Sequence, residues 1–357
     1  MSRYFSYKYQ GLKPYVPGEQ PKDKKFIKLN TNESPFPPSP KAIKYAAEAV
    51  GRANLYPDPE YKALCKAFAD DIGVKPAQVI PANGSDEILD MAFSAFCDDK
   101  TPAAFADITY GFYKVFAGKY NVPYEIIPLA DDFTINTDDY VGINKTVFIA
   151  NPNAPTGLLL SLAEIEKIVS TNPENVVVID EAYIDFGGES AIKLIDKYKN
   201  LLVTRTFSKS RSMAGARLGF GVACEELIAD LNALRFSTNP FNIDSMTVAS
   251  GIGSIEDKEY FRENIDSIIK NRKYLEKELE ALGFELTDSN TNFVFAKHPD
   301  ITGAEMYKKL RDNGILVRFF DAPRTKEYVR ITIGAAEEMQ ILAETLKKSR
   351  RSINEKL

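Results

Sequence analysis

The sequence contains very little histidine and cysteine. Its single histidine, His298, excludes metal sites built from several histidines, and its Lys-His-Pro-Asp setting is typical of a surface turn rather than of a catalytic base. The three cysteines, Cys65, Cys97 and Cys224, are too few and too far apart for a disulfide framework or a paired-cysteine metal site. They favour a reducing, cytoplasmic environment. Any acid-base chemistry must fall to lysine, tyrosine, aspartate or glutamate.

The sequence also lacks an excess of positive charge and any long apolar run. Its 45 lysines and arginines face 50 aspartates and glutamates, so the net charge of −5 supplies no general attraction for nucleic-acid phosphates. No apolar run approaches the roughly 20 residues that cross a bilayer, and the N-terminal segment has no signal-peptide core. We therefore expect a cytoplasmic protein that acts on small molecules, without nucleic-acid or membrane partners.

What the 357-residue chain does contain is an alternation of helix-like and strand-like segments. Periodic apolar positions predict helices over 41–50, 60–71 and 83–96, and Ser161 with Glu164 has the spacing of a capping box at the start of another helix. Several of the expected strands are apolar without alternation, which is typical of a mostly parallel sheet covered by helices on both faces. The fold class is therefore α/β. The strands are expected at 78–81, 103–106, 124–129, 146–150, 176–180, 201–206 and 218–223.

Both ends of the chain differ from this central pattern. Residues 1–40 are rich in Tyr, Lys and Pro and are expected to form an arm ahead of a large domain at 41–245. Residues 246–357 are expected to form a smaller α+β domain, in which Phe293 and Phe295 alternate as in a half-buried strand. Its other expected elements are helices near 256–282 and 303–313, strands near 315–319 and 328–333, and a terminal basic helix.

Three polar segments follow predicted strands, where open α/β sheets place their ligands. Residues 83–87 could hold a phosphate at a helix N-terminus, or could simply cap that helix. Residues 151–157 are rich in turn-forming types and predict an ordered loop. Asp180 ends an apolar strand shortly before Tyr183; a buried carboxylate there needs a cationic or donor partner, although it could also cap the next element.

A fourth segment places a lysine directly after an apolar strand. Lys209 is flanked by Ser208 and Ser210 and followed by Arg211. Neighbouring cations and burial depress the pKa of an amine, which favours Schiff-base chemistry. Arg217, further along, would bring to the same pocket a fixed charge suited to a phosphate.

Together these segments resemble the fold-type I aminotransferases, which use pyridoxal 5′-phosphate (PLP). The resemblance covers nearly the whole chain, because the matching motifs occur in the family's order. It implies a mostly parallel central sheet with helices on both faces plus a smaller α+β domain. The matching motifs lie at 29–35, 56–59, 84–87, 151–157, 208–209 and 328–334.

The resemblance also implies roles for individual residues. Lys209 would hold PLP as a Schiff base, and Asp180 would pair with the protonated pyridine nitrogen so that the ring remains an electron sink. With Tyr183, these would be the catalytic residues. The implied cofactor-binding residues are Asn153 and Tyr183 at the ring hydroxyl, Tyr110 stacked on the ring, Ser85, Asp86, Thr206, Ser208 and Arg217 at the phosphate, and Tyr56 from the second subunit of a homodimer.

Two positions depart from the family pattern. Ala154 stands where many relatives have a second asparagine, which leaves Asn153 as the inferred partner of the ring. Ser34 replaces a common asparagine in the arm. Neither change removes a group that the chemistry requires.

The implied substrate site is built around arginine. Arg330 matches the arginine that binds the substrate carboxylate, since a planar two-pronged donor suits that group. Tyr15 and Arg318 match positions near the far end of the substrate, where a phosphate would sit, and Asn30 completes the implied substrate-binding set.

The resemblance implies transamination, in which a small amino donor gives its amino group to a 2-oxo acid, expected to be 2-oxoglutarate, without a metal. A phosphorylated amino alcohol is the favoured donor; transamination of an aromatic amino acid and decarboxylation of threonine phosphate are the alternatives. A regulator that lost catalysis is disfavoured, because Lys209, Asp180 and Arg217 are all present and the arm is too short for a DNA-binding domain.

Overall fold

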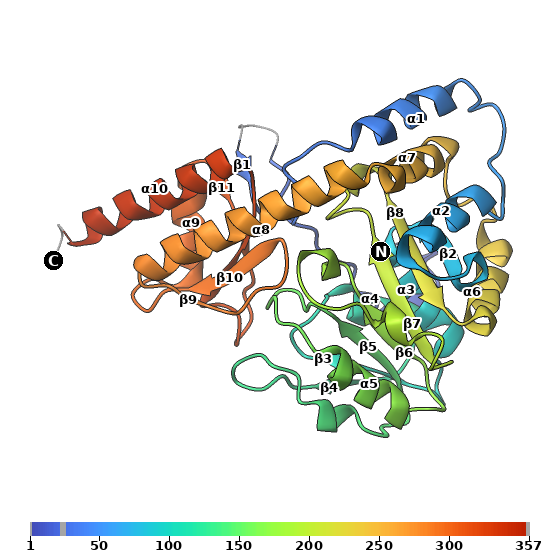
Figure 1. Ribbon diagram of the computed structural model, residues 1–357. Coiled ribbons are helices and arrows are strands. Elements are labelled where there is room, and N and C mark those ends of the chain that lie inside the picture. The colour runs from blue at the N-terminus through green and yellow to red at the C-terminus, as the bar shows by residue number, and fades with distance from the viewer. Residues whose placement is uncertain (1, 22–25, 355–357) are drawn as a thin grey trace.

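The computed structural model describes residues 2–21 and 26–354, and two main sheets organise it (Figure 1). The larger sheet has seven strands and the smaller has four. The long helix α8 (Lys258–Ala281) runs from beside the large sheet to the small one. None of the helices in the described ranges is long and apolar enough to cross a membrane.

The large sheet is mostly parallel, which confirms the expected fold class. Its strand order is β2-β8-β7-β6-β5-β3-β4, and β8 alone runs antiparallel to its neighbours. The strands β5, β6 and β7 therefore end at the same edge, where Ala150 lies beside Asp180 and Asp180 beside Thr204. The strands are β2 (Val79–Asn83), β3 (Ala103–Ala106), β4 (Tyr124–Ile127), β5 (Thr146–Ala150), β6 (Val177–Asp180), β7 (Leu201–Thr206) and β8 (Leu218–Ala223).

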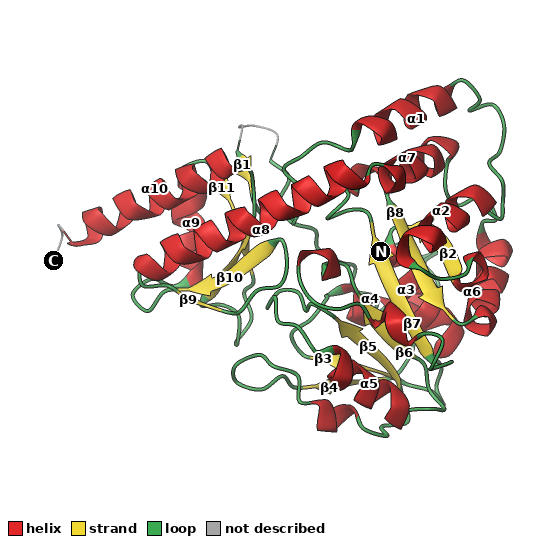
Figure 2. Ribbon diagram, in the orientation of Figure 1, coloured by secondary structure: helices red, strands yellow, loops and turns green. Residues whose placement is uncertain are grey.

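Helices cover both faces of this sheet (Figure 2), because successive apolar residues of each strand point to opposite sides. In β6, Val177 and Ile179 enter one core, while Val178 enters the other. The first core includes residues of α2 (Lys62–Ile72), α5 (Leu162–Thr171) and α7 (Ser245–Glu256). The second includes residues of α3 (Ser85–Phe96), α4 (Phe112–Tyr120) and α6 (Glu225–Thr238).

The expected capping box at the start of α5 is present. Ser161 Oγ accepts a hydrogen bond from the Glu164 backbone N–H at 3.3 Å, and Glu164 Oε2 accepts one from the Ser161 N–H at 2.7 Å. These bonds satisfy amides that the helix itself cannot pair. The helix that crosses from β5 to β6 therefore starts where the sequence predicts.

The small sheet is antiparallel, with the order β12-β13-β10-β9. The strand expected over 315–319 is divided, because β11 pairs with β1 of the N-terminal segment while β12 joins the small sheet. The elements of this region are β1 (Ile27–Lys28), β9 (Glu285–Leu286), β10 (Phe293–Lys297), β11 (Ile315–Leu316), β12 (Arg318–Phe319), β13 (Tyr328–Thr332), α9 (Gly303–Asp312) and α10 (Ala336–Asn354).

The strand β10 is more buried than the alternation of its phenylalanines predicted. Val294 and Ala296 are buried as well as Phe293 and Phe295. The reason is that Phe295 packs against Phe133 and other residues that follow the strands of the large sheet, so both faces of β10 are covered. The small sheet is therefore packed against the large one at the edge where the candidate site lies.

The helix α7 was not expected as a separate element. The predicted helix near 256–282 is α8, and α7 precedes it, with Asp257 between the two. Gly253 of α7 lets α1 (Pro40–Val50) approach closely, because a Cβ there would lie 2.6 Å from the Lys41 carbonyl oxygen. The domain boundaries at 40/41 and 245/246 stay predictions.

This close helix contact predicts that Gly253→Ala destabilises the protein. The added methyl group must push two helix backbones apart, a cost of about 1–3 kcal/mol that exceeds the gain in helix propensity. Thermal unfolding followed by circular dichroism would show a lowered midpoint. Gly215→Ala is the matched control, because no atom of the described residues, apart from its two chain neighbours, lies within 4 Å of its added Cβ. Equal midpoints for the two variants would contradict the packing argument.

Candidate active site

All four polar segments expected from the sequence meet in one cavity of about 100 Å³ at the carboxyl edge of the large sheet. Parallel strands end there together, and the N-terminus of α3 faces them, so segments distant in sequence become neighbours. The lining residues are Ser85, Asp86, Tyr110, Ala150, Ala154, Asp180, Ala182, Tyr183, Thr206, Ser208, Lys209 and Arg217.

Asp180 is the buried anion of this cavity. It ends β6 with a 3% exposed side chain, and its oxygens accept hydrogen bonds from Thr204 Oγ1 at 2.8 Å and Tyr113 Oη at 3.2 Å. Burial raises the pKa of Asp180 to about 6, although both hydrogen bonds act in the opposite direction. No lysine or arginine in the described ranges forms an ion pair with it. The carboxylate is therefore suited to a cationic partner brought by a ligand.

Lys209 brings the only lysine amine that lines this cavity within the described part of the chain. Its Nζ donates a hydrogen bond to the Thr31 carbonyl oxygen at 3.2 Å and lies 5.8 Å from the centre of the Tyr183 ring. The side chain is half-buried. A primary amine held by a single carbonyl bond beside open space can react with an aldehyde.

The start of α3 forms a cradle for an anion. The first N–H groups of this helix, at Ser85 and Asp86, have no partner within the helix. Gly84, at φ +77°, allows the chain to turn there, and a Cβ on it would lie 2.7 Å from Arg217 Nη2. A Cβ on Gly219 would lie 2.3 Å from the Ser85 nitrogen. Glycine at both positions therefore keeps the cradle open and close to the Arg217 guanidinium.

Side chains complete the cradle. Arg217 pairs with Asp86 at 2.9 Å, and its Nη1 donates to Ser208 Oγ at 3.3 Å. Thr206 Oγ1 lies 3.0 Å from the same Ser208 oxygen. Two hydroxyls, one guanidinium and a helix N-terminus thus converge, and this donor set suits a phosphate.

Two tyrosines line the remaining walls. Tyr110 Oη donates to Asp86 Oδ1 at 2.7 Å, and burial raises the pKa of Tyr110 well above its usual value. Tyr183 is 9% exposed, accepts a hydrogen bond from Asn32 Nδ2 at 2.9 Å, and meets the Phe293 ring edge-on at 5.2 Å. Asn32 comes from the N-terminal segment and was not singled out from the sequence.

The structure does not bring Asn153 into the cavity. Its Nδ2 donates to the Ile108 carbonyl oxygen at 3.0 Å and to Thr156 Oγ1 at 2.9 Å, so both amide protons are engaged. Its Oδ1 accepts from Thr109 Oγ1 at 2.8 Å. Ala154 lines the cavity instead, with no polar side chain. The expected contact of Asn153 with a cofactor ring stays a prediction, and it would require the amide to give up one of these bonds.

Two arginines of the small sheet face each other without a counter-ion. Arg318 on β12 and Arg330 on β13 are directly opposite in the register, and no carboxylate in the described ranges pairs with either. Arg330 Nη2 donates to the Asn30 carbonyl oxygen at 3.1 Å, while its buried Nε has no hydrogen-bond partner among the described residues. Desolvation and the neighbouring Arg318 lower the pKa of Arg330. Such a pair favours a bound anion.

The other expected substrate residues lie around these arginines. Arg318 donates to the carbonyl oxygens of Val16 and Pro17 at 3.4 Å and lines a second cavity of about 190 Å³ with Asn30. The adjacent Tyr15 stacks on Phe112 at a ring distance of 4.3 Å. The arm therefore reaches the expected substrate region.

Tyr56 does not line the active-site cavity within its own chain. Its side chain is 80% exposed and stacks on Phe241 at 4.5 Å. This placement leaves the ring free to contact another molecule.

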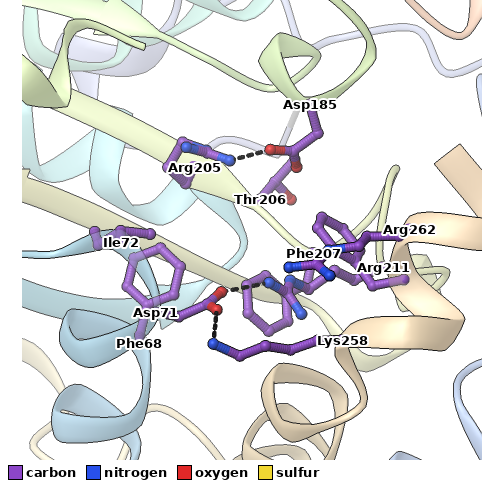
Figure 3. A pocket seen from close by; sticks show the side chains of 11 residues that line it. Phe68, Asp71, Ile72, Asp185, Arg205, Thr206, Phe207, Arg211, Lys258 and Arg262 are labelled. Carbon is purple, nitrogen blue, oxygen red and sulfur yellow. Dashed lines mark hydrogen bonds and ion pairs between the residues drawn. The ribbon is translucent and has the colours of Figure 1, made fainter.

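A larger cavity of about 290 Å³ is lined by Thr206, Phe207 and Arg211, which lie on both sides of Lys209 in the sequence (Figure 3). The ion pairs around this cavity were not predicted from the sequence. Asp71 pairs with Arg211 at 2.7 Å and with Lys258 at 3.1 Å. Asp185 pairs with Arg205 and accepts a hydrogen bond from Ser210 Oγ at 2.5 Å. These pairs fix the residues on both sides of Lys209. Arginines flanking the lysine were visible in the sequence, but their acidic partners lie on distant elements.

Comparison with known proteins agrees with this arrangement. The family model for aminotransferase class I and II matches residues 24–346. A histidinol-phosphate aminotransferase of Marinomonas sp. (strain MWYL1) is 50% identical over 351 residues, which cover 97% of this chain and 99% of that protein. One of Clostridium acetobutylicum is 44% identical over 349 residues, with 98% and 99% covered.

Solved structures show the same likeness. The crystal structure of histidinol-phosphate aminotransferase from Sinorhizobium meliloti in complex with pyridoxal-5′-phosphate matches with a TM-score of 0.89 and 25% identity, and the match covers 99% of each chain. Fold, cavity and sequence agree over almost the full length. The chain belongs to the class I and II aminotransferases and, within them, to the family of the histidinol-phosphate aminotransferases.

Proposed function

We propose that this protein is a PLP-dependent aminotransferase of histidine biosynthesis. It transfers the amino group of L-histidinol phosphate to 2-oxoglutarate, which gives imidazole acetol phosphate and glutamate. The observation that carries the proposal is one cavity that joins an amine, a buried carboxylate and a phosphate cradle, together with two arginines that no carboxylate of the described residues pairs with. The names of relatives at 44–50% identity support the choice of substrate.

The cavity residues fit PLP in chemistry as well as in position. Asp180 offers a buried anion to the protonated pyridine nitrogen, which explains why the protein leaves it without a cation. Tyr110 offers an aromatic face and Tyr183 a phenol. The phosphate would be held by the backbone at Ser85 and Asp86 together with the side chains of Thr206, Ser208 and Arg217.

The chain's own residues then carry the chemistry. Bound through the Lys209 amine, PLP supplies a conjugated ring that accepts the electron pair left when the Cα–H bond of the donor breaks. Lys209 Nζ, freed when the donor amine takes its place, would take the proton from the donor Cα and deliver it to C4′ of the cofactor. Asp180 keeps the positive charge on the ring nitrogen through this transfer.

Arg318 and Arg330 bind the anionic ends of the two substrates in turn. The donor has a phosphate and no carboxylate, whereas 2-oxoglutarate has two carboxylates. Both groups accept paired N–H bonds from a planar guanidinium, so the same arginines can serve both half-reactions. Tyr15 and Asn30 lie beside this pair and complete the substrate site.

We also propose a cytoplasmic homodimer. Tyr56 is an exposed ring that matches the position from which the family reaches the cofactor of the neighbouring subunit. The cytoplasmic location rests on the cysteines, because Cys65, Cys97 and Cys224 are all buried free thiols.

A comparison of donors tests the substrate. The purified holoenzyme should show its highest kcat/KM with L-histidinol phosphate and 2-oxoglutarate, above L-tyrosine, L-phenylalanine and L-threonine phosphate. Arg318→Ala should raise the KM for histidinol phosphate by about ten- to a hundredfold, because a charge-assisted bond to the phosphate is lost. Its effect on tyrosine should be smaller. Activity on the aromatic amino acids alone, or release of CO₂ from threonine phosphate, would contradict the assignment.

Lys209→Ala should abolish turnover, with a loss of at least about a thousandfold, because no other lysine of the described chain lines the cavity. The visible absorbance band of the bound cofactor should disappear, while the circular dichroism spectrum stays unchanged. Lys44→Ala, at an exposed position on α1, is the matched control. Full turnover in Lys209→Ala would rule out the proposed chemistry.

Asp180→Asn should raise the stability of the apoprotein and lower its affinity for the cofactor. Burial raises the pKa of Asp180 from 3.8 to about 6, so the folded state holds the proton more tightly than the unfolded state. Stability is therefore lost as pH rises through this window, and at pH 8 the ionised carboxylate costs the apoprotein about 2–3 kcal/mol.

In urea unfolding, the Asp180→Asn apoprotein should therefore gain stability over the wild type at pH 8 and show no such gain at pH 4. Its affinity for PLP should fall, because the anion opposite the ring nitrogen is gone. Asp266→Asn, at an exposed position on α8, should change neither quantity. A PLP affinity equal to that of the wild type would contradict the pairing of Asp180 with the ring.

A further inference from the structure

We propose that Asn32 is a positioning residue that, together with Thr332, directs the hydroxyl proton of Tyr183 into the cofactor site. The inference rests on the proposed function, because it concerns how the phenol meets the ring oxygen of PLP. Neither Asn32 nor Thr332 lines the cavity; both act through Tyr183.

The direction of each hydrogen bond follows from one that cannot be reversed. The Asn32 backbone N–H donates to Thr332 Oγ1 at 3.0 Å, so this hydroxyl oxygen is an acceptor there. Thr332 has its own proton left, and Asn32 Oδ1 accepts it at 3.0 Å. The other end of the amide, Nδ2, then faces Tyr183 Oη at 2.9 Å and donates to it. Tyr183 accepts, and its proton remains free.

The opposite orientation of the Asn32 amide would break this pattern. Nδ2 would then face Thr332 Oγ1, and the hydroxyl proton of Thr332 would lose its acceptor on Asn32. Oδ1 would face Tyr183 and take the phenol proton away from the cavity. The observed orientation satisfies the buried threonine and leaves Tyr183 as a donor toward the site.

Surrounding contacts hold Asn32 and Thr332 in place. The side chains of Asn32 and Thr332 are 1% and 2% exposed. Asn292 Nδ2 donates to the Asn32 carbonyl oxygen at 3.0 Å, and the Thr332 N–H donates to the Leu29 carbonyl oxygen at 3.0 Å. Asn32 has φ +55°, a left-handed conformation that asparagine adopts more readily than most residues. The amide therefore has little freedom to turn.

The direction matters because, among the described residues of the loop after β5, neither Asn153 nor Ala154 has a free side-chain donor for the cofactor ring. Both amide protons of Asn153 are engaged, and Ala154, which lines the cavity, has no polar side chain. Tyr183 is left as the donor for the ring oxygen. A donated hydrogen bond disperses negative charge on that oxygen, so it lowers the pH at which the bound cofactor loses its proton.

The hydrogen bonds from Thr332 through Asn32 to Tyr183 also link the cofactor site to the substrate arginines. Thr332 lies two residues after Arg330 on β13, so both side chains point to the same face of the strand. The strand β13 thus supplies Arg330 to the anion site and Thr332 to the hydrogen bonds that orient the Tyr183 hydroxyl.

The test is a spectroscopic titration of the holoenzyme, which follows the visible absorbance band of the bound cofactor against pH. Asn32→Asp keeps the shape and tolerates the left-handed backbone, but its ionised carboxylate accepts the Tyr183 proton. The titration midpoint should rise by about one pH unit, toward that of Tyr183→Phe. Thr332→Val, which frees the amide to turn, should raise it by less, and Thr332→Ser, which keeps the hydroxyl, should match the wild type.

A double variant separates this effect from the new charge itself. In the Tyr183→Phe background, Asn32→Asp should raise the midpoint by less than it does in the wild type, because only the new charge acts once no phenol proton remains to be redirected. An equal rise with and without the phenol would overturn the proposal, as would a wild-type midpoint in Asn32→Asp. If Asn32→Asp fails to fold, equal midpoints for Thr332→Val and Thr332→Ser would overturn it. A wild-type protein that shows no cofactor band at all would instead contradict the proposed function.

Discussion

The buried carboxylate of Asp180 is the constraint around which the site is organised. A charge at the end of a central strand is costly unless it is paired. Among the described residues, Asp180 accepts hydrogen bonds from the Thr204 and Tyr113 hydroxyls and the Ala182 backbone N–H, but it has no cationic partner. The raised pKa of Asp180 expresses this cost. A ligand with a cationic ring nitrogen relieves this cost, so the buried charge that destabilises the apoprotein favours binding of the cofactor. The cradle at α3 and the amine of Lys209 then fix the two other ends of that ligand.

The N-terminal segment connects this site to the small sheet. The Thr31 carbonyl oxygen accepts a hydrogen bond from Lys209, the Asn30 carbonyl oxygen accepts one from Arg330, and Asn32 bonds both Tyr183 and Thr332. Consecutive residues thus contact the reactive amine, the substrate arginine and the phenol at the cofactor. The segment therefore holds the catalytic and substrate-binding halves of the site in register.

Much of the fold was predictable because its determinants are local. The strands β3, β5, β7 and β8 have the expected bounds, since continuous apolar runs between turn signals mark buried strands. The helix α7 was missed because its glycines and serines hide an amphipathic pattern, and these small residues serve close packing against α1. The division of 315–319 between two sheets depends on β1, which lies far away in the sequence.

The site was predictable as a set of motifs and much less as a set of contacts. Lys209, Asp180 and Arg217 all line the cavity. They could be singled out from the sequence because each lies at the end of an expected strand or close to one. The roles of Tyr113, Thr204 and Asn32 depend on partners up to 300 residues away, which no local pattern encodes. The expected contact of Asn153 with the ring stays a prediction: its residue type fits, but its amide protons bond to the Ile108 carbonyl oxygen and to Thr156 of the same loop.

The state of the cofactor's ring nitrogen tests the central claim most directly. Nitrogen NMR of the holoenzyme, loaded with PLP labelled with ¹⁵N in the ring, reports whether that atom carries a proton. The pairing with Asp180 predicts a protonated nitrogen throughout the range from about pH 6.5 to 8.5, which lies above the carboxyl pKa of about 6. An unprotonated nitrogen in this range would contradict the account, because the buried carboxylate would then face no cation.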